Sequence, residues 1–278
     1  MLKSNPSIKL LVLDLDGTAL ASDKSFSERN KRAVENVANS GIKVIFATGR
    51  SIIGIADEIL QLSCVRYVIA SNGARIFDLG LGKSLYECYL SNTALEMIMN
   101  NVRKFKDTSV SLYCNGSCFM DRVSYDKITG DKNSYPQWFR EYITKVQTVY
   151  NSVEEIDMHC VEKVVCFFKS REVRKKAIST MRFVEGVQVS SGNDYSIEIA
   201  DKSVSKGNSL GILAKMLGIR NEEIMSIGDN ENDRSMFEVS GISVAMENAE
   251  DSIKLEADYV TKSNDNDGVA YIIEKLLL

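Results

Sequence analysis

The stretch Lys9–Thr18 reads KLLVLDLDGT, so a run of branched apolar side chains leads directly into two carboxylates and a Gly-Thr pair. Such a run predicts a buried strand of the kind that a parallel sheet requires. Its polar end would lie at the carboxyl edge of the sheet, where open α/β sheets bind their ligands. Two acidic groups at the end of a buried strand need positive charge nearby. Mg2+, a hard cation bound through oxygen atoms, is the natural partner.

Two further apolar runs follow the first one and also end in polar residues. Ile42–Ala47 and Tyr67–Ala70 read as buried strands, closed by Thr-Gly-Arg and Ser-Asn-Gly. Between the first two strands, the segment Ser27–Gly41 has the cap, apolar spacing and glycine stop of a helix. The apolar spacing over residues 52–60 predicts a second helix. This alternation of strands and helices predicts a parallel sheet with right-handed crossovers.

From about residue 84 the pattern changes to short strands mixed with helices. We predict strands near 109–113, 117–120, 164–168 and 187–190, and helices near 93–105, 135–142 and 171–183. This mixture favours an inserted α+β domain over residues 84–198. The first pattern then returns, with helices at 206–217, 249–256 and from 269, and strands at 224–227, 242–245 and 259–261. The fold class is therefore α/β, a Rossmann-like parallel-sheet core of residues 1–83 and 199–278 with an inserted cap domain.

The composition limits the possible partners and the compartment of the protein. The formal net charge of −4 argues against nucleic acid, because a phosphate backbone is bound by a basic face. No apolar run approaches the roughly 18 residues of a membrane span, and the polar start MLKSNP lacks the features of a signal peptide. The six cysteines lie at irregular spacings, which is typical of reduced thiols. We therefore expect a soluble, cytoplasmic protein.

Carboxylates, a hydroxyl and a lysine recur at strand ends and helix starts, in a pattern that suits phosphoryl transfer. Asp14 directly follows the apolar strand and is a candidate nucleophile. Asp16 points to the same side of an extended strand and could act as general acid and base. Mg2+, Thr48 and Lys206 could neutralise the oxygens of a transferring phosphoryl group. Taken one at a time, these residues also fit a turn, a calcium-type loop, a helix start or a solvated charge.

The ordered set of motifs resembles the haloacid dehalogenase (HAD) superfamily of phosphotransferases. Within it, the chain is most similar to the Cof-like phosphatases of subfamily IIB, which carry a large cap after the third strand. The resemblance covers nearly the whole chain. The matching segments are DLDGT at 14–18, ATGR at 47–50, SKG at 205–207, GDNEND at 228–233, VAMENA at 244–249 and NDNDGV at 264–269.

The resemblance implies roles for the carboxylates. Asp14 would form a phosphoaspartyl intermediate, and Asp16 would protonate the leaving oxygen and then activate water. Mg2+ would be bound by the Asp14 carboxylate, the Asp16 backbone carbonyl and Asp229. Asn72 and Gly73 resemble family residues near the mouth of the site.

The resemblance also implies which residues hold the phosphoryl group. Thr48 and Lys206 would bind it, together with the backbone amide of Gly49. Asn232 would contact the substrate or its phosphate, and Asp233 would orient Lys206 or the ligands of the metal.

The resemblance leaves the substrate open. We expect hydrolysis of small phosphorylated metabolites, sugar phosphates first, with specificity residing in the cap at 84–198. A phosphomutase of the same superfamily is an alternative, and a non-catalytic phosphate-binding sensor is another. The pair Asp14 and Asp16 argues against the sensor. We expect a monomer or a weak homo-oligomer.

Overall fold

The computed structural model describes residues 7–151, 156–193 and 195–278, and its internal contacts divide the chain into two compact units. The first unit combines Met1–Gly49, Ile55–Tyr86 and Ser205–Leu278. The second unit combines Arg50–Gly54 with Glu87–Val204. Segments from both ends of the chain therefore share one unit, and the middle of the chain forms the other.

The first unit is built on an eight-stranded sheet in the order β14-β13-β12-β1-β2-β3-β4-β5. The strands from β14 to β3 are parallel, which confirms the predicted parallel core. Strand β4, the last but one at this side of the sheet, runs antiparallel to β3, which the sequence pattern did not predict. The strands are β1 (Leu10–Leu13), β2 (Lys43–Ala47), β3 (Val65–Ala70), β4 (Arg75–Asp78), β5 (Lys83–Glu87), β12 (Ile224–Gly228), β13 (Ile242–Ala245) and β14 (Tyr259–Val260).

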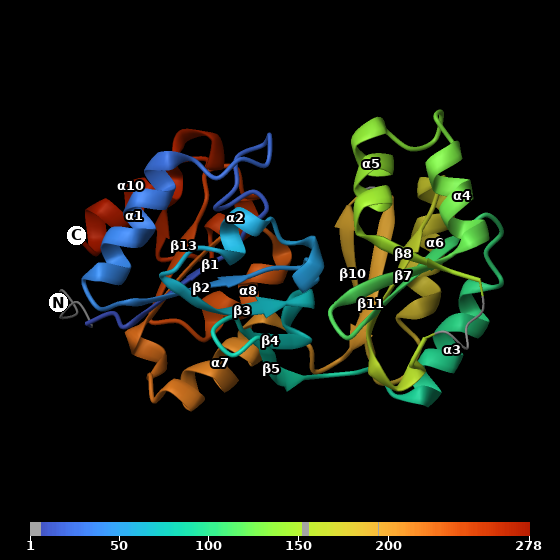
Figure 1. Ribbon diagram of the computed structural model, residues 1–278, viewed down its shortest axis with the longest axis horizontal. Helices are drawn as coiled ribbons and strands as arrows, with labels where there is room; N and C mark the ends of the chain where they lie inside the picture. Colours follow the sequence, from blue (N-terminus) through green and yellow to red (C-terminus); the bar gives the residue numbers. More distant parts are fainter. Residues whose placement is uncertain (1–6, 152–155, 194) are drawn as a thin grey trace. The chain divides into compact units, whose positions relative to one another are not determined.

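Helices cover both faces of this sheet (Figure 1). Helix α7 (Lys206–Leu217) and helix α8 (Arg234–Glu238) lie on one face, where Leu210 and Leu213 of α7 belong to the same apolar cluster as Leu10 of β1. Helix α1 (Glu28–Asn39) packs with α10 (Gly268–Leu276) on the other face. All four residues of β1 are inaccessible to solvent. Because side chains point alternately to the two faces of a strand, β1 is buried on both sides of the sheet.

Two predicted helices are shorter in the structure. The single helix expected over 52–60 is wrong, because a 3-10 turn at Ile52–Gly54 and helix α2 (Asp57–Leu60) are separated by an extended Ala56 with ψ 142°. The 3-10 turn belongs to the second unit and α2 to the first, so the boundary between the units interrupts the predicted helix. The helix expected over 249–256 is only α9 (Asp251–Lys254), because Glu250 is extended and acts as its N-cap.

The second unit has its own six-stranded sheet, in the order β10-β11-β9-β6-β7-β8. Its pairs are antiparallel except β7 with β8. The strands are β6 (Ser109–Cys114), β7 (Ser117–Asp121), β8 (Gln147–Tyr150), β9 (Val161–Phe167), β10 (Val187–Asn193) and β11 (Ser196–Asp201). Strands β8 and β11 were not predicted; β8 pairs in parallel with β7, and β11 lies between β10 and β9.

Helices pack on both faces of the second sheet as well. Helix α3 (Asn92–Val102) and helix α6 (Arg171–Met181) share one apolar core, while α4 (Arg122–Gly130) and α5 (Gln137–Val146) share the other. Helix α4 was not predicted from the sequence. The available signal was Asp121, whose side chain accepts a hydrogen bond from the Ser124 N–H and caps the helix.

No helix in the described residues has the length and apolar character that crossing a bilayer demands. All six cysteines are free thiols.

Helices α7 and α8 approach each other closely at Gly207. A Cβ on Gly207 would lie 1.9 Å from the carbonyl oxygen of Ser235, whereas a Cβ on Gly211, one turn later in α7, would meet nothing within 4 Å. Gly207→Ala should therefore lower the free energy of unfolding by about 2 kcal/mol through overpacking. Gly211→Ala is the matched control and should raise it by up to about 1 kcal/mol through helix propensity. Urea unfolding of both variants measures the difference, and equal effects would contradict the close packing.

Candidate active site

Three neighbouring parallel strands bring separate motifs to one edge of the first unit's sheet. Asp14 follows β1, Thr48 follows β2 and Asp229 follows β12. Lys206 is the first residue of α7, whose N-cap Ser205 accepts a hydrogen bond from the Asn208 N–H. Since parallel strands end at a common edge, residues more than 200 positions apart in the chain share this region.

A buried lysine lies between two buried carboxylates. The Nζ of Lys206 donates to Oδ1 of Asp14 at 2.6 Å and to Oδ1 of Asp233 at 2.7 Å. The three residues are 1%, 5% and 0% exposed, respectively. Charges this deep in a protein persist only when they are paired and hydrogen bonded. The three segments that carry them must therefore be in place together.

Burial and the neighbouring charges shift the pKa values of Lys206 and Asp14. Burial by itself lowers the pKa of Lys206, but the charges and hydrogen bonds of Asp14 and Asp233 outweigh it and raise the pKa above its usual value. Burial is also the main reason that the pKa of Asp14 lies well above its usual range; Lys206 lowers it only in part, and the charges of Asp233 and Asp229 raise it further. One lysine thus compensates only part of the charge of this region.

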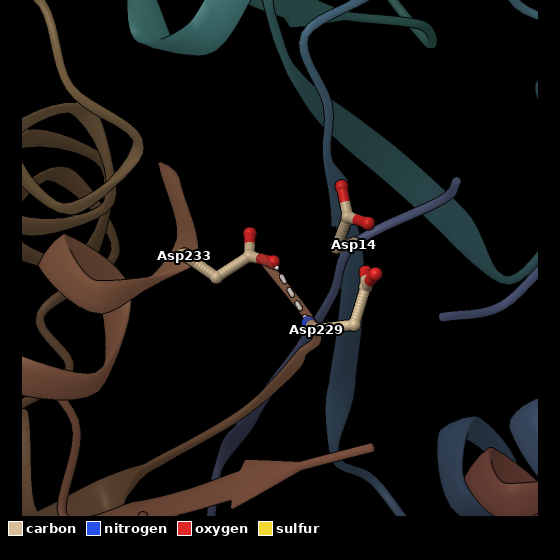
Figure 2. Close-up of side chains that lie close together, drawn as sticks. All are labelled: Asp14, Asp229 and Asp233. Atoms are coloured by element: carbon tan, nitrogen blue, oxygen red, sulfur yellow. Dashed lines mark hydrogen bonds between the residues drawn. The ribbon is translucent and has the colours of Figure 1, made fainter. Parts of the chain in front are cut away.

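Asp229 completes a group of three carboxylates (Figure 2). Oxygen atoms of Asp14, Asp229 and Asp233 lie within 4.8 Å of one another. Burial, followed by the charge of Asp233, raises the pKa of Asp229 to about 6. The hydroxyl of Thr18 donates to Oδ1 of Asp229 at 2.9 Å. A Cβ on Gly17, which has φ +83°, would lie 2.4 Å from Oδ2 of Asp229, so the backbone passes close to this carboxylate.

The three carboxylates are not equivalent as possible metal ligands. Oδ1 of Asp233 is held by Lys206, and its Oδ2 accepts the N–H groups of Asp229 at 2.9 Å and Asn230 at 3.0 Å. Asp14 and Asp229 retain oxygen atoms for a cation, and such a donor set fits a hard ion such as Mg2+. Across the part of the chain that the structure describes, no other group of three or more His, Cys, Asp or Glu side chains is spaced to hold a metal.

Asp16 is placed differently from Asp14, although both follow the same strand. Its side chain is 39% exposed and is not among the three clustered carboxylates. The Nζ of Lys24 lies 2.9 Å from Oδ1 of Asp16. Asp16 therefore presents a solvent-accessible carboxylate next to a buried one, which suits exchange of protons with a substrate or with water.

Thr48, Gly49 and Asn232 gather around Asn72. The Asn72 N–H donates to the Thr48 carbonyl at 3.0 Å, and the Asn232 amide donates to Oδ1 of Asn72 at 2.9 Å. A Cβ on Gly49 would lie 3.0 Å from the same Oδ1. Thr48 itself is 1% exposed. The motifs after β2, β3 and β12 are thus joined by direct contacts.

Three residues of this region had no assigned role from the sequence. Thr18 supports Asp229, and its position inside the DLDGT motif was a usable signal. Asn248 donates from Nδ2 to the Gly17 carbonyl at 2.8 Å, and it lies in the VAMENA segment noted above. Nothing in the sequence indicated that Lys24 contacts Asp16, because a single lysine in a polar turn resembles any solvated charge.

Comparison with known proteins identifies the family of this chain. The family model of the haloacid dehalogenase-like hydrolases matches residues 11–273. A 5-amino-6-(5-phospho-D-ribitylamino)uracil phosphatase of Bacillus subtilis is 30% identical over 292 residues, covering 97% of this chain and 98% of its own.

Two solved structures of the same family have a similar fold. A haloacid dehalogenase-like hydrolase from Bacteroides thetaiotaomicron superposes with a TM-score of 0.84 at 27% identity, covering 97% of this chain and 100% of its own. The subclass IIB sugar phosphatase BT4131 superposes with a TM-score of 0.81 at 22% identity, covering 96% and 98%, and at that identity it bears on the fold alone. The chain described here belongs to the haloacid dehalogenase-like hydrolases and is a phosphatase.

Proposed function

We propose that this phosphatase is Mg2+-dependent and hydrolyses small phosphorylated metabolites, sugar or sugar-alcohol phosphates first, through a phosphoaspartyl intermediate on Asp14. The observation that carries this proposal is the Asp14–Lys206–Asp233 arrangement beside Asp229. It combines a carboxylate held in one orientation with oxygen ligands for a cation. We also propose a cytoplasmic enzyme that acts as a monomer or weak homo-oligomer, without a nucleic acid or membrane partner.

In the first step, an Asp14 oxygen attacks the phosphorus of the ester. The bond between phosphorus and the ester oxygen breaks, and the leaving oxygen takes a proton from Asp16. Lys206 fixes the direction of the Asp14 carboxylate through the 2.6 Å contact. Lys206 would also bind the phosphoryl oxygens, together with Thr48, the Gly49 amide and Asn232, so that their charge is stabilised as it spreads during transfer.

In the second step, Asp16 acts as a carboxylate base. It takes a proton from water while the water oxygen attacks phosphorus, and the bond from phosphorus to Asp14 breaks. Inorganic phosphate leaves, Asp14 is restored as a carboxylate, and Asp16 is again protonated. The partly exposed position of Asp16 supports this exchange, since both the leaving group and water must reach it.

The residues that would hold Mg2+ are Asp14, Asp229 and the backbone carbonyl of Asp16, with Asp233 in support. When bound, the ion supplies positive charge that keeps Asp14 and Asp229 ionised and balances the phosphoryl oxygens. Burial and the neighbouring carboxylates raise the pKa values of Asp14 and Asp229, and a bound cation would offset both effects, which supports this assignment.

The substrate class is supported by a relative. The Bacillus subtilis relative is named for a phosphorylated ribityl compound. That name describes a phosphate ester on a small, hydroxyl-rich carbon chain. We extend this class to the present chain.

Removal of divalent ions tests the proposed cofactor. After treatment with EDTA, hydrolysis of p-nitrophenyl phosphate should fall by at least about 100-fold, because a metal stabilises transition-state charge by several kcal/mol. Titration with Mg2+ should restore the rate, and circular dichroism should show the same fold with and without the chelator. Full activity in protein shown to be free of divalent ions would contradict the proposal.

Asp14→Asn tests the covalent mechanism. The variant keeps an oxygen that can accept from Lys206 but lacks the nucleophile, so kcat should fall by at least about 1000-fold. Asp251→Asn is the matched control, since the Asp251 side chain is 96% exposed and its loss should leave the rate unchanged. Steady-state assays with p-nitrophenyl phosphate measure both variants. Wild-type turnover by the folded Asp14→Asn protein would exclude Asp14 as the nucleophile.

A panel of phosphate esters tests the substrate class. We expect kcat/KM for phosphorylated sugars and sugar alcohols to exceed that for a phosphotyrosine peptide by at least about 10-fold, since a site built to hydrogen bond hydroxyl groups rejects substrates that lack them. Release of inorganic phosphate is the common measurement. A preference for the peptide would overturn the assignment while leaving the phosphatase activity intact.

A further inference from the structure

The turn Ser71–Gly73, directly after β3, has a backbone that most residues avoid. Ser71, Asn72 and Gly73 have φ values of 52°, 57° and 105°. The left-handed region is strained for residues with a Cβ, although Asn tolerates it better than most. Ser71 is fully buried at this position. Strain of this kind persists only where surrounding contacts hold it, and it is concentrated at functional sites.

The contacts of this turn reach three separate motifs of the first unit. The Asn72 N–H binds the carbonyl of Thr48 at 3.0 Å, and Oδ1 of Asn72 accepts from Nδ2 of Asn232 at 2.9 Å. A Cβ on Gly73 would lie 2.2 Å from the carbonyl oxygen of Ser205, the residue before Lys206. One three-residue turn is therefore in contact with the segments that carry Thr48, Lys206 and Asn232.

We propose that Asn72 is a positioning residue, whose side-chain carbonyl orients the Asn232 amide toward the phosphoryl group that Thr48 binds. This inference rests on the proposed function above. A side-chain amide has two donors and one acceptor. When Asn72 accepts one N–H of the Asn232 amide, that contact sets the direction of the second N–H and of the oxygen of Asn232. Asn72 itself acts through Asn232 and is not assigned a contact with the substrate.

The residue type at 72 has to satisfy two independent requirements. The backbone requires a residue that tolerates φ 57°, and the contact with Asn232 requires a short side chain with an acceptor. Glycine meets only the first requirement. Aspartate meets both, but it adds a negative charge close to the residues that would bind a dianionic phosphate. Substitution can therefore separate the two requirements.

Asn72→Gly removes the acceptor and keeps the left-handed backbone. We expect kcat/KM for p-nitrophenyl phosphate to fall by about 10- to 100-fold, the usual cost of a small misplacement in a catalytic site. The unfolding temperature should not fall, since glycine relieves backbone strain. Asn72→Asp keeps the acceptor, so it should mainly raise KM through repulsion and retain more of kcat. The matched control for the backbone effect is Asn115→Gly, at φ 50° in the β6–β7 turn, which should likewise not lower the unfolding temperature.

A double-mutant cycle shows whether Asn72 acts through Asn232. The double variant Asn72→Gly with Asn232→Ala should have a kcat/KM within about 3-fold of that of Asn232→Ala alone, because the positioned group is already missing. If Asn72 had only a structural role, the fold-losses in kcat/KM of the two single variants would multiply in the double variant. Multiplied losses, or wild-type kcat/KM for Asn72→Gly, would overturn the proposal.

Failure of the proposed function is distinguishable from failure of this inference. If the wild-type protein hydrolysed no phosphate ester, the proposed function would fall, and the same four proteins of the cycle would be compared in urea unfolding. Direct contact between the two amides predicts non-additive changes in the free energy of unfolding. Additive changes there would overturn the positioning role as well.

Discussion

The buried ion pair of Lys206 with Asp14 and Asp233 is the constraint on which the rest of the site depends. Removing one partner from such a group leaves an unbalanced charge where water cannot reach it, which is strongly destabilising. The three residues come from the end of β1, the start of α7 and the loop after β12. Apolar packing of α7 against the sheet sets the position of the lysine. Hydrophobic packing and charge pairing therefore determine the same geometry.

The same group of charges explains why this region is suited to a cation. Three carboxylates share one lysine, and the pKa values of Asp14 and Asp229 are raised because burial and mutual repulsion disfavour their charged forms. Under the proposed function, Mg2+ would balance the negative charge of Asp14 and Asp229, while Asp233 accepts a hydrogen bond from Lys206. Asp16, outside the cluster and in contact with Lys24, remains accessible for proton transfer. Two aspartates that are neighbours in sequence thus have different environments, and different environments permit different chemical roles.

Local patterns gave much of the fold of the first unit. Helix α7 begins and ends where its apolar spacing and its Ser205 cap predict, and β13 was predicted at its observed residues. Errors arose where the local pattern was overridden. The apolar spacing over 52–60 is divided between the two units, and β4 and β8 form only because a partner strand is present. A short strand has no strong pattern of its own, so its existence depends on pairing that sequence spacing does not encode.

The sequence alone determined which residues are candidates for chemistry, because each stands at the end of an apolar strand or at the start of a helix. For one of them it also indicated a partner, since the family resemblance implied that Asp233 orients Lys206 or the ligands of the metal. Only the tertiary structure decided that Lys206 also binds Asp14, that Asn72 binds Asn232, and that Lys24 pairs with Asp16. The Lys206–Asp14 and Asn72–Asn232 contacts join residues 192 and 160 positions apart. Contacts of this range follow from the order of strands in the sheet, which results from packing the whole chain and is not written in any single segment.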